Sequence, residues 1–289
     1  RNKIEALSGE QYFLEEARFG YDQKTHKIEV GKPIGQFYGY KTLGLYQVED
    51  FDYNAKDQTY TLKEGIPYMS GTFNRSDIRP GMWKFDDRNG DKVIDDSDMS
   101  VIGNANPDFY GGLNNQFKYK GWDFNFFFTF SYGGEVLNAT KLTNTKTATT
   151  NYSVLNIADS SNRWMTVNSE GQLITDPEEM AAINAGRTVA CIYDMEAGDK
   201  YIHSWAVEDA SYLRLSNVNL GYTFDRKKLR NFNIQSLRLY FTGSNLFVWT
   251  PYSGFDPEVS TKGNNLTPGV DYGAYPRNRS YVFGLNITF

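Results

Sequence analysis

Residues 122–132, WDFNFFFTFSY, alternate large aromatic side chains with mostly polar ones over eleven positions. Successive side chains on a β-strand point to opposite faces, so the aromatic ones share a single face. That face carries Trp122, Phe124, Phe126, Phe128, Phe130 and Tyr132, and the other carries Asp123, Asn125, Phe127, Thr129 and Ser131. A membrane-spanning strand needs roughly 9 to 11 residues and favours Trp and Tyr near the two interfaces. The stretch therefore predicts a strand whose aromatic face meets hydrocarbon.

The same alternation predicts four more strands. They are YGGLNNQFKYK (110–120), VNLGYTF (218–224), SLRLYFTGSNLF (236–247) and SYVFGLNITF (280–289). A tight turn at Lys120-Gly121 joins the first of them to the aromatic strand. Leu213 and Leu215 have the opposite parity to Val218, which predicts a β-bulge near Ser216-Asn217. We expect inward polar groups such as Asp123, Asn125, Thr129, Asn219 and Thr223 to line the wall of a lumen.

The connections between these strands alternate between short and long. The long ones cover about 48–108, 133–210 and 250–279, and the second contains a predicted short helix at 176–183. Outer-membrane barrels have short periplasmic turns and long extracellular loops. This pattern predicts extracellular long loops and a periplasmic C-terminus. The basic connector with Arg226, Lys227, Lys228 and Arg230 is then a solvated periplasmic turn.

Five strands are too few to close a barrel. Even if 11–19 and 36–47 add two, the total stays below the eight of the smallest bacterial barrels. An open sheet in a membrane leaves edge backbone groups unsatisfied. The predicted fold class is all-β, an antiparallel transmembrane β-barrel of which these 289 residues form the C-terminal portion. The chain starts at Arg1 without a signal segment, so we expect it to be internal to a longer precursor.

Composition excludes several function classes. The net charge of -5 and pI near 5.2 argue against nucleic acid. Cys191 is the single cysteine, which rules out an internal disulfide, and His26 and His203 leave little for histidine-based catalysis. No run approaches the roughly 20 apolar residues of a membrane helix.

Several motifs resemble the C-terminal third of the SusC/RagA-like TonB-dependent outer-membrane transporters. The resemblance extends over most of the chain in consistent order. It is carried by GKPIGQFYGYKTLGLYQ (31–47), DDRNGDKVIDDSDMSVIGNANPDFYGGLNNQFKYKGWDFNFFFTFSYGGE (86–135), EDASYLRLSNVNLGYTF (208–224), LRLYFTGSNLF (237–247), YSGFDPEV (252–259) and DYGAYPRNRSYVFGLNITF (271–289).

The resemblance implies a barrel of roughly 22 strands with an N-terminal plug, in the outer membrane of a Gram-negative bacterium of the Bacteroidetes type. It also implies a SusD-like surface lipoprotein as partner, energy from the TonB complex, and a glycan fragment or oligopeptide as cargo. The inward polar groups would then line the wall or contact the plug. From outer-membrane proteins generally, the aromatic last strand (280–289) is expected to be the recognition segment for barrel insertion. No plug and no TonB box are identifiable in residues 1–289.

Residues 87–98, DRNGDKVIDDSD, have the spacing of an EF-hand-type calcium loop. The expected ligands are Asp87, Asn89, Asp91, the carbonyl of Val93, Asp95 and Asp98. We expect Ile94 to anchor the loop by packing. Lys92 stands where glycine permits the sharp turn, and Asp98 is shorter than the usual Glu. The alternative is an acidic surface turn without an ion.

Other candidate residues have simpler interpretations. Cys191 lacks a nearby histidine, and the pairs Asp95/Asp96 and Glu178/Glu179 are typical of solvated acids, so no catalytic residue is assigned and the chain is not expected to be an enzyme. Loop aromatics can stack on cargo or pack the loops together. They are Trp164, Tyr193, Trp205, Trp249, Tyr252, Tyr272 and Tyr275. FDPEV at 255–259 predicts only a turn at Asp256-Pro257.

Two rival functions use the same alternation. A secreted, calcium-stabilised β-sandwich that binds carbohydrate would bury its apolar faces between two sheets. A passive porin would need no plug. The length of the aromatic strand and the apolar final strand favour the transporter, because a soluble protein would leave that strand as an exposed edge.

Overall fold

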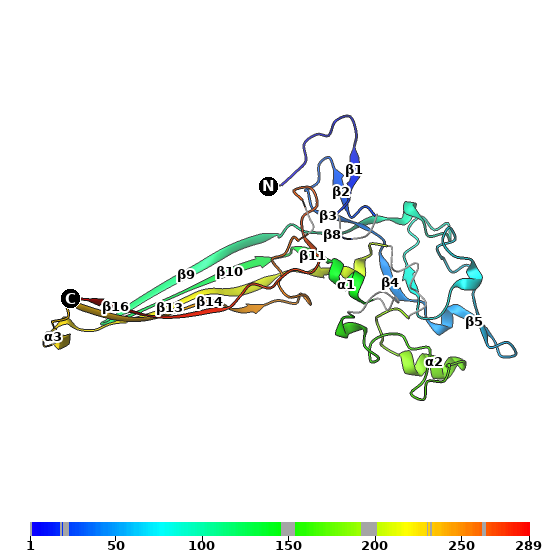
Figure 1. Ribbon diagram of the computed structural model, residues 1–289. Helices are drawn as coiled ribbons and strands as arrows, with labels where there is room; N and C mark the ends of the chain where they lie inside the picture. Colours follow the sequence, from blue (N-terminus) through cyan, green and yellow to red (C-terminus); the bar gives the residue numbers. More distant parts are fainter. Residues whose placement is uncertain are drawn as a thin grey trace. The chain divides into compact units, whose positions relative to one another are not determined.

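The computed structural model describes residues 2–17, 19, 23–145, 154–191, 201–229, 231, 233–261 and 264–289 (Figure 1). The chain forms two compact units. The long-sheet unit comprises Asn106–Val136, Glu208–Val259 and Ala274–Phe289. The loop unit comprises Arg1–Ala105, Leu137–Val207 and Ser260–Gly273.

The long-sheet unit is one antiparallel sheet with the order β16-β14-β13-β10-β9. Its strands are β9 (Phe109–Tyr119), β10 (Trp122–Tyr132), β13 (Tyr212–Thr223), β14 (Ser236–Trp249) and β16 (Ser280–Thr288). The short helix α3 (Arg226–Leu229) lies in the connection between β13 and β14. The five strands predicted from alternation are confirmed. Lys120, with φ +53°, forms the predicted turn between β9 and β10.

The predicted β-bulge in β13 is also confirmed. Phe127 of β10 pairs with Asn217, whereas Phe128 pairs with Leu215, so Ser216 is the extra residue. The bulge changes the parity of β13 at this point. As a result Leu215 and Val218 lie on the same face of the sheet.

The loop unit is built from short strands. They are β1 (Tyr12–Glu15), β2 (His26–Glu29), β3 (Gln36–Gly39), β4 (Thr42–Leu45), β5 (Phe51–Asn54), β6 (Thr59–Leu62), β7 (Trp83–Phe85), β8 (Ser100–Asn104) and β15 (Val270–Asp271). β1, β2, β3 and β8 form one sheet, β4 pairs with β7, and β5 with β6. β11 (Glu135–Asn138) and β12 (Val207–Asp209) lie where the chain passes from one unit to the other, and β11 pairs in parallel with β15.

The two additional barrel strands considered at 11–19 and 36–47 are not formed. Both segments give four-residue strands of the loop unit instead. Phe37 and Tyr40 are almost fully buried in protein cores. Side chains that a protein core already covers cannot line a membrane-facing wall, which is why these segments do not extend the long sheet.

Helices are few among the described residues. They include α1 (Ala139–Asn144) and α2 (Pro177–Asn184), and short 3-10 helices at Val48–Asp50, Arg75–Asp77, Asp96–Asp98, Asn156–Ala158 and Ser204–Ala206. The predicted helix at 176–183 is confirmed as α2, where the Asp176 carboxylate accepts a hydrogen bond from Glu179 N at 2.9 Å. None of the helices in the described ranges combines the length and apolarity needed to cross a bilayer.

The loop unit has its own apolar cores. One gathers around Trp164 with Leu62, Met82 and Met180. A second surrounds Phe37 with Leu137, Ile202 and Val270. A third joins Tyr40, Met69, Phe85 and Ile94. The segments predicted as long loops are therefore folded together rather than loosely arranged.

A buried ion network in the long-sheet unit gives FDPEV a physical role. Arg214 of β13, only 3% exposed, donates to Asp256 Oδ1 at 2.6 Å and to Glu258 Oε2 at 3.0 Å. The guanidinium of Arg277 pairs with Glu258 at 3.0 Å. Close beside the motif in sequence, Tyr252 is buried against Val136 and Ala210. The motif is thus more than the predicted turn, because its two acids attach the 250–279 connection to β13.

Both histidines of the loop unit are internal packing groups. His26 is fully buried, its Nε2 donates to Pro268 O at 2.9 Å, and its Nδ1 lies 2.8 Å from Thr25 Oγ1. Burial lowers the pKa of His26 from 6.5 to about 4. His203 Nδ1 lies 2.8 Å from Thr42 Oγ1, and its ring stacks on Trp205.

We expect Asp256→Asn to lower the free energy of unfolding by about 3 kcal/mol, because it removes the closer and more buried of the two carboxylates that balance the buried Arg214. Asp86→Asn is the matched control, since Asp86 pairs with the exposed Lys41 at 3.3 Å and such pairs contribute only about 0–1 kcal/mol. Thermal unfolding of the full-length protein in detergent compares the two variants. Equal melting temperatures would contradict a structural role for the Arg214 network.

The stability of the loop unit should fall on mild acidification. The pKa of His26 is lower in the folded protein than in the unfolded chain, so its contribution is complete above pH 6.5 and is lost as the pH falls toward 4. Between pH 7.5 and 5 the loss is about 2 kcal/mol. His26→Gln should remove this part of the dependence, as measured by unfolding at the two pH values. An unchanged slope in the variant would show that His26 is not responsible.

Candidate functional site

One face of the long sheet carries uncovered apolar side chains. Trp122 pairs with Tyr222, Phe124 with Leu220, and directly paired residues share a face. Many of these side chains are exposed, including Phe109, Leu113, Phe117, Tyr119, Trp122, Phe124, Tyr132, Leu213, Leu220, Leu239, Phe247, Trp249, Tyr281, Phe283, Leu285 and Ile287. Phe283 is 80% exposed. A large apolar side chain left in water forgoes roughly 1.5–3 kcal/mol of burial, so this face requires apolar surroundings.

The dimensions of this face fit a bilayer. β10 is eleven residues long, from Trp122 to Tyr132. At about 3.3 Å per residue it is about 36 Å long, and a tilt of about 45° reduces its height to about 26 Å. The apolar band of outer-membrane barrels is about 25 Å tall and is flanked by aromatic residues. Trp122 and Tyr132 lie at the two ends of the strand, where such aromatic residues are expected.

The opposite face carries a network of polar contacts across the strands. Arg238 of β14 pairs with Asp123 of β10 at 2.6 Å, and Thr242 Oγ1 donates to Asn219 Oδ1 at 2.7 Å. Asn125 donates to Asn114 Oδ1 at 2.9 Å. The predicted inward residues therefore do share a polar face. Such a face suits a water-filled lumen, in which the pairs are partly hydrated.

Gly221 makes the Arg238–Asp123 pair possible. It lies on β13 between β10 and β14, directly opposite Asp123. A Cβ at Gly221 would overlap both the Arg238 guanidinium and the Asp123 carboxylate. The missing side chain therefore lets two charges meet across an intervening strand.

The loop aromatics divide into packing residues and accessible ones. Trp164 and Tyr252 are buried in cores, 2% and 5% exposed, so they pack the structure. Trp249 lies on the apolar face of β14, opposite Leu213. Tyr193 and the basic residue Arg230 lie outside the described residues.

The two remaining tyrosines differ in their environment. Tyr272 packs against Phe19 with ring centroids 5.9 Å apart. Tyr275 is 84% exposed.

Trp205 differs from these tyrosines because it lines a pocket of the loop unit. Of the loop aromatics within the described residues, Trp205 is thus the one that combines partial burial with access to a cavity.

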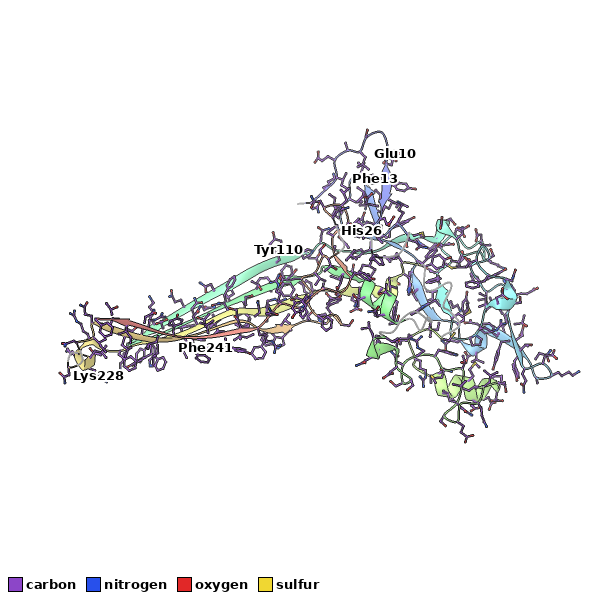
Figure 2. The ribbon with its side chains drawn as sticks, viewed as in Figure 1. Glu10, Phe13, His26, Tyr110, Lys228 and Phe241 are labelled. Carbon is purple, nitrogen blue, oxygen red and sulfur yellow. The ribbon has the colours of Figure 1, made fainter. Side chains whose placement is uncertain are left out.

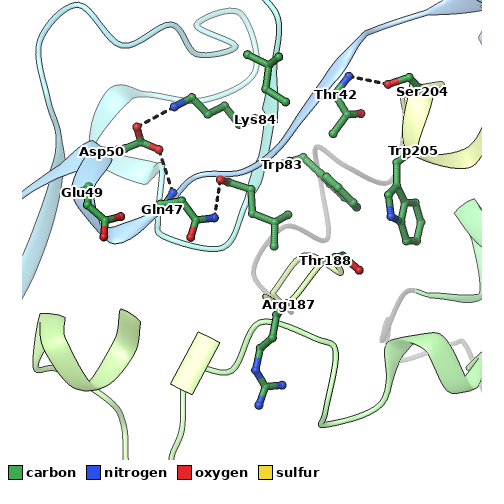
Figure 3. Close-up of a pocket in the computed structure, with 13 residues that line it drawn as sticks. Thr42, Gln47, Glu49, Asp50, Trp83, Lys84, Arg187, Thr188, Ser204 and Trp205 are labelled. Atoms are coloured by element: carbon green, nitrogen blue, oxygen red, sulfur yellow. Dashed lines mark hydrogen bonds and ion pairs between the residues drawn. The ribbon is translucent and has the colours of Figure 1, made fainter. Parts of the chain in front are cut away.

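A pocket of about 660 Å³ in the loop unit is lined by two tryptophans and several polar groups (Figure 3). Trp83 and Trp205 lie side by side with ring centroids 5.0 Å apart. The ammonium of Lys141 lies 4.1 Å from the centre of the Trp205 ring. It also donates a hydrogen bond to the backbone oxygen of Trp205 at 2.9 Å. Tryptophan side chains at a pocket wall can contact sugar rings or apolar side chains of peptides.

Polar and charged groups complete the same pocket. Lys84 pairs with Asp50 at 2.7 Å, and the Asp50 carboxylate also accepts a hydrogen bond from Gln47 N at 2.9 Å. Arg187 donates to the carbonyl oxygens of Ile183 and Arg163 at 2.8 and 2.6 Å. The pocket therefore combines an aromatic wall with fixed hydrogen-bonding groups, which is the usual composition of a small-ligand site.

In the calcium-type loop the side-chain oxygens bond to the loop's own backbone. Asp87 accepts from Gly90 N and Lys92 N at 2.8 and 2.9 Å, and Asp91 accepts from Val93 N at 2.8 Å. Hydrogen bonds from Ser97 hold the pKa of Asp95 below its usual value. Asp87 is half-buried, whereas Asn89, Asp91 and Asp95 are exposed.

The two departures from the EF-hand pattern have structural consequences. Lys92 adopts φ +69°, a conformation that glycine would reach without strain. Asp98 is fully buried and accepts from Arg88 N and Asp95 N at 2.8 and 3.0 Å. Ile94 is buried beside Tyr40, as predicted. Within the described residues, no three His, Cys, Asp or Glu side chains are grouped so as to hold a metal ion.

The remaining chemical candidates lie in ordinary environments. Cys191 is buried in the core around Trp164. Asp95, Glu178 and Glu179 are exposed. Asp96 accepts a hydrogen bond from the Tyr40 hydroxyl at 3.3 Å, and burial followed by the Asp96 charge raises the pKa of Tyr40. These groups stabilise the fold or face solvent, in line with the simpler interpretations.

The sequence did not indicate that Trp83 lines a pocket or that Arg214 forms buried ion pairs. Trp83 meets Trp205 across 122 positions of sequence, and no local pattern signals that contact. Arg214 did carry a signal, because it is a charged residue within an alternating strand and two acids occur at 256 and 258. The sequence therefore allowed a prediction that Arg214 pairs with these acids, but not that the pair is buried.

No family model matches the chain. The TonB-dependent receptor P3 of Formosa agariphila is 34% identical over 296 residues, which cover 100% of this chain and 26% of the relative. The TonB-dependent receptor P39 of the same organism is 30% identical, over 93% of this chain and 26% of that protein. The TonB-dependent receptor SusC of Bacteroides thetaiotaomicron is 29% identical, over 71% of this chain and 17% of that protein.

Solved structures show the same fold. The RagAB peptide importer in its 'closed-closed' state matches 99% of this chain and 26% of the solved chain, with a TM-score of 0.61 and 18% identity. Its 'open-open' state matches with a TM-score of 0.57. The chain spans about a quarter of the length of the curated relatives P3 and P39. The chain belongs to the SusC/RagA-like TonB-dependent receptors, and its long sheet is part of their outer-membrane β-barrel.

Proposed function

We propose that the protein containing this chain imports oligosaccharides or oligopeptides across the outer membrane, with energy supplied through TonB. The observation that carries the proposal is the long sheet, whose apolar face is exposed and whose other face is polar. The similarity to TonB-dependent receptors supports the energy source, and the similarity to a peptide importer supports the kind of cargo. Transport proceeds by gating, without a catalytic residue.

We also propose a SusD-like surface lipoprotein as lid over the extracellular side. The connections 48–108, 133–210 and 250–279 contribute to a folded loop unit with its own cores, which offers a defined docking surface. The proposal includes an orientation in which these connections are extracellular and the C-terminus is periplasmic. The short β9–β10 turn and the connection containing α3 are then on the periplasmic side.

The rival functions account less well for the structure. A β-sandwich would cover the apolar face with a second sheet, whereas Phe283, Leu239 and Phe117 are exposed on this face. A passive porin would not need energy from TonB, and the relatives are TonB-dependent receptors. The energy requirement is therefore the property that separates an importer from a porin.

Cells that produce the full-length protein should accumulate labelled oligosaccharides or oligopeptides, and the accumulation should stop when the proton gradient is dissipated. Cells lacking the protein are the control. Uptake that continues after dissipation would indicate a porin. Absence of uptake for both cargo classes would contradict the importer.

The tryptophan-lined pocket provides a test of cargo class. If the cargo is a glycan, Trp83→Ala and Trp205→Ala should each weaken its binding roughly fivefold or more, because a stacked aromatic contributes about 1 kcal/mol or more. Tyr275→Ala is the control, since Tyr275 is an exposed aromatic outside this pocket. Isothermal titration with a defined oligosaccharide and a defined peptide measures the effect. Unchanged affinity for both ligands would exclude the pocket as a cargo contact.

We propose that Ca²⁺ braces the 87–98 loop. Five groups present oxygens in the expected spacing, namely Asp87, Asn89, Asp91, the Val93 carbonyl and Asp95. Asp98 already serves the backbone of the loop, so it contributes through loop shape unless the loop rearranges. With fewer acidic ligands than a strong site, the expected dissociation constant is on the order of 10⁻⁴ to 10⁻³ M.

Calcium at about 5 mM should raise the melting temperature of the full-length protein, and the combined variant Asp87→Asn and Asp91→Asn should abolish that increase. Stabilisation follows from mass action, because the ion binds the folded loop alone. Asp52→Asn with Asp57→Asn is the matched control, since both acids are exposed in the loop unit. A wild-type protein that shows no response to calcium would leave the loop as an acidic turn.

A further inference from the structure

One end of the long sheet is strongly basic. In the described residues this end includes the turn between β9 and β10 and the connection that contains α3 (Figure 1). The basic side chains there are Lys118, Lys120, Arg226, Lys227, Lys228 and Arg238, and the acidic ones are Asp123 and Asp225. The whole chain, in contrast, carries a net charge of -5. The side chains at this end therefore carry a net positive charge, although the chain as a whole is acidic.

The strand register places these groups at one level. Trp122 pairs with Tyr119 on one side and with Tyr222 on the other, and Thr223 pairs with Arg238. Aromatic rings mark the same level, since Trp122 lies 4.7 Å from Tyr222 between ring centroids. Trp and Tyr gather at membrane interfaces. The basic residues that follow β13 therefore lie just beyond the aromatic level, at the depth of lipid headgroups.

Three of the cations are exposed and, among the described residues, have no carboxylate within ion-pair distance. They are Arg226, Lys227 and Lys228. The Asp225 carboxylate accepts a hydrogen bond from Lys227 N at 2.9 Å, so it serves the backbone of the turn. Leu229 is the buried residue of α3. Figure 2 shows Lys228 at this end of the sheet.

A pocket of about 680 Å³ adjoins these cations. Its lining consists of Asp225, Arg226, Lys227, Asn233, Ile234 and Gln235. It offers cationic groups together with the polar side chains of Asn233 and Gln235. This combination can accept a phosphate group and its hydrated surroundings.

We propose that this basic rim, defined as Arg226, Lys227 and Lys228 with the adjoining pocket, binds the phosphate groups of anionic phospholipids in the leaflet at this end of the barrel. Opposite charge and headgroup depth select this occupant. A cation near an anionic bilayer surface strengthens binding by about fivefold, so three of them distinguish anionic from zwitterionic lipid clearly. The proposal rests on the barrel spanning a membrane and is independent of cargo and of TonB.

The test uses the full-length protein in detergent, titrated with phosphatidylglycerol and, separately, with phosphatidylcholine, and read by native mass spectrometry. The combined variant Arg226→Gln, Lys227→Gln and Lys228→Gln should bind phosphatidylglycerol at least tenfold more weakly than wild type. The matched control is Lys3→Gln, Lys32→Gln and Lys56→Gln, which removes three exposed lysines from the loop unit. This control should bind as wild type does.

Several outcomes would overturn the proposal. They are equal phosphatidylglycerol binding by the rim variant and wild type, equal binding of the two lipids by wild type, or an equal loss in the lysine control. Displacement of phosphatidylglycerol by lipid A at equal or lower concentration would assign the rim to lipopolysaccharide instead. Melting temperatures of both variants verify that they are folded. If lipid binding behaves as expected while uptake fails, the rim stands and the import function does not.

Discussion

Hydrocarbon beside the apolar face of the long sheet is the constraint on which the rest of the structure depends. That face carries Phe124, Leu239 and Phe283 among its exposed residues. Water would make such a surface costly, whereas a bilayer makes it favourable.

The backbone of the sheet sets a second requirement. β9 and β16 are its edge strands, so their outer backbone groups have no partner strand within the sheet. In a membrane their outer edges must pair with further strands, so the long sheet is a segment of a barrel wall.

Charges are distributed as this environment requires. Asp123 and Arg238 meet on the polar face, where Gly221 leaves room for the pair. The buried Arg214 is balanced by Asp256 and Glu258, which attach a long connection to the wall. The loop unit, in contrast, encloses its own apolar cores, one around Trp164 and one around Phe37. The two units of the chain thus differ in what covers their apolar side chains.

The five long strands were predictable because apolar and polar side chains alternate within stretches of seven to twelve residues, and the change of parity between Leu215 and Val218 indicated the bulge. The short strands of the loop unit were not, since four residues such as Gln36–Gly39 show too little periodicity. The tryptophan pocket escaped prediction because Trp83 and Trp205 meet only through tertiary folding. For the calcium loop, spacing predicted the oxygens, but only the structure shows that Asp98 is committed to the backbone.

Spin labels placed on both faces of the long sheet test the membrane environment most directly. Labels would replace Phe124, Leu220 and Phe283 on the apolar face, and Asn125, Asn219 and Thr242 on the polar face, in the full-length protein in a bilayer. At Phe124, Leu220 and Phe283 we predict that oxygen, which partitions into lipid, strongly relaxes the spin label. At Asn125, Asn219 and Thr242 we predict that a water-soluble nickel complex does so instead. Equal exposure of both faces to the nickel complex, or protection of the apolar face from both reagents, would contradict a lipid-facing wall.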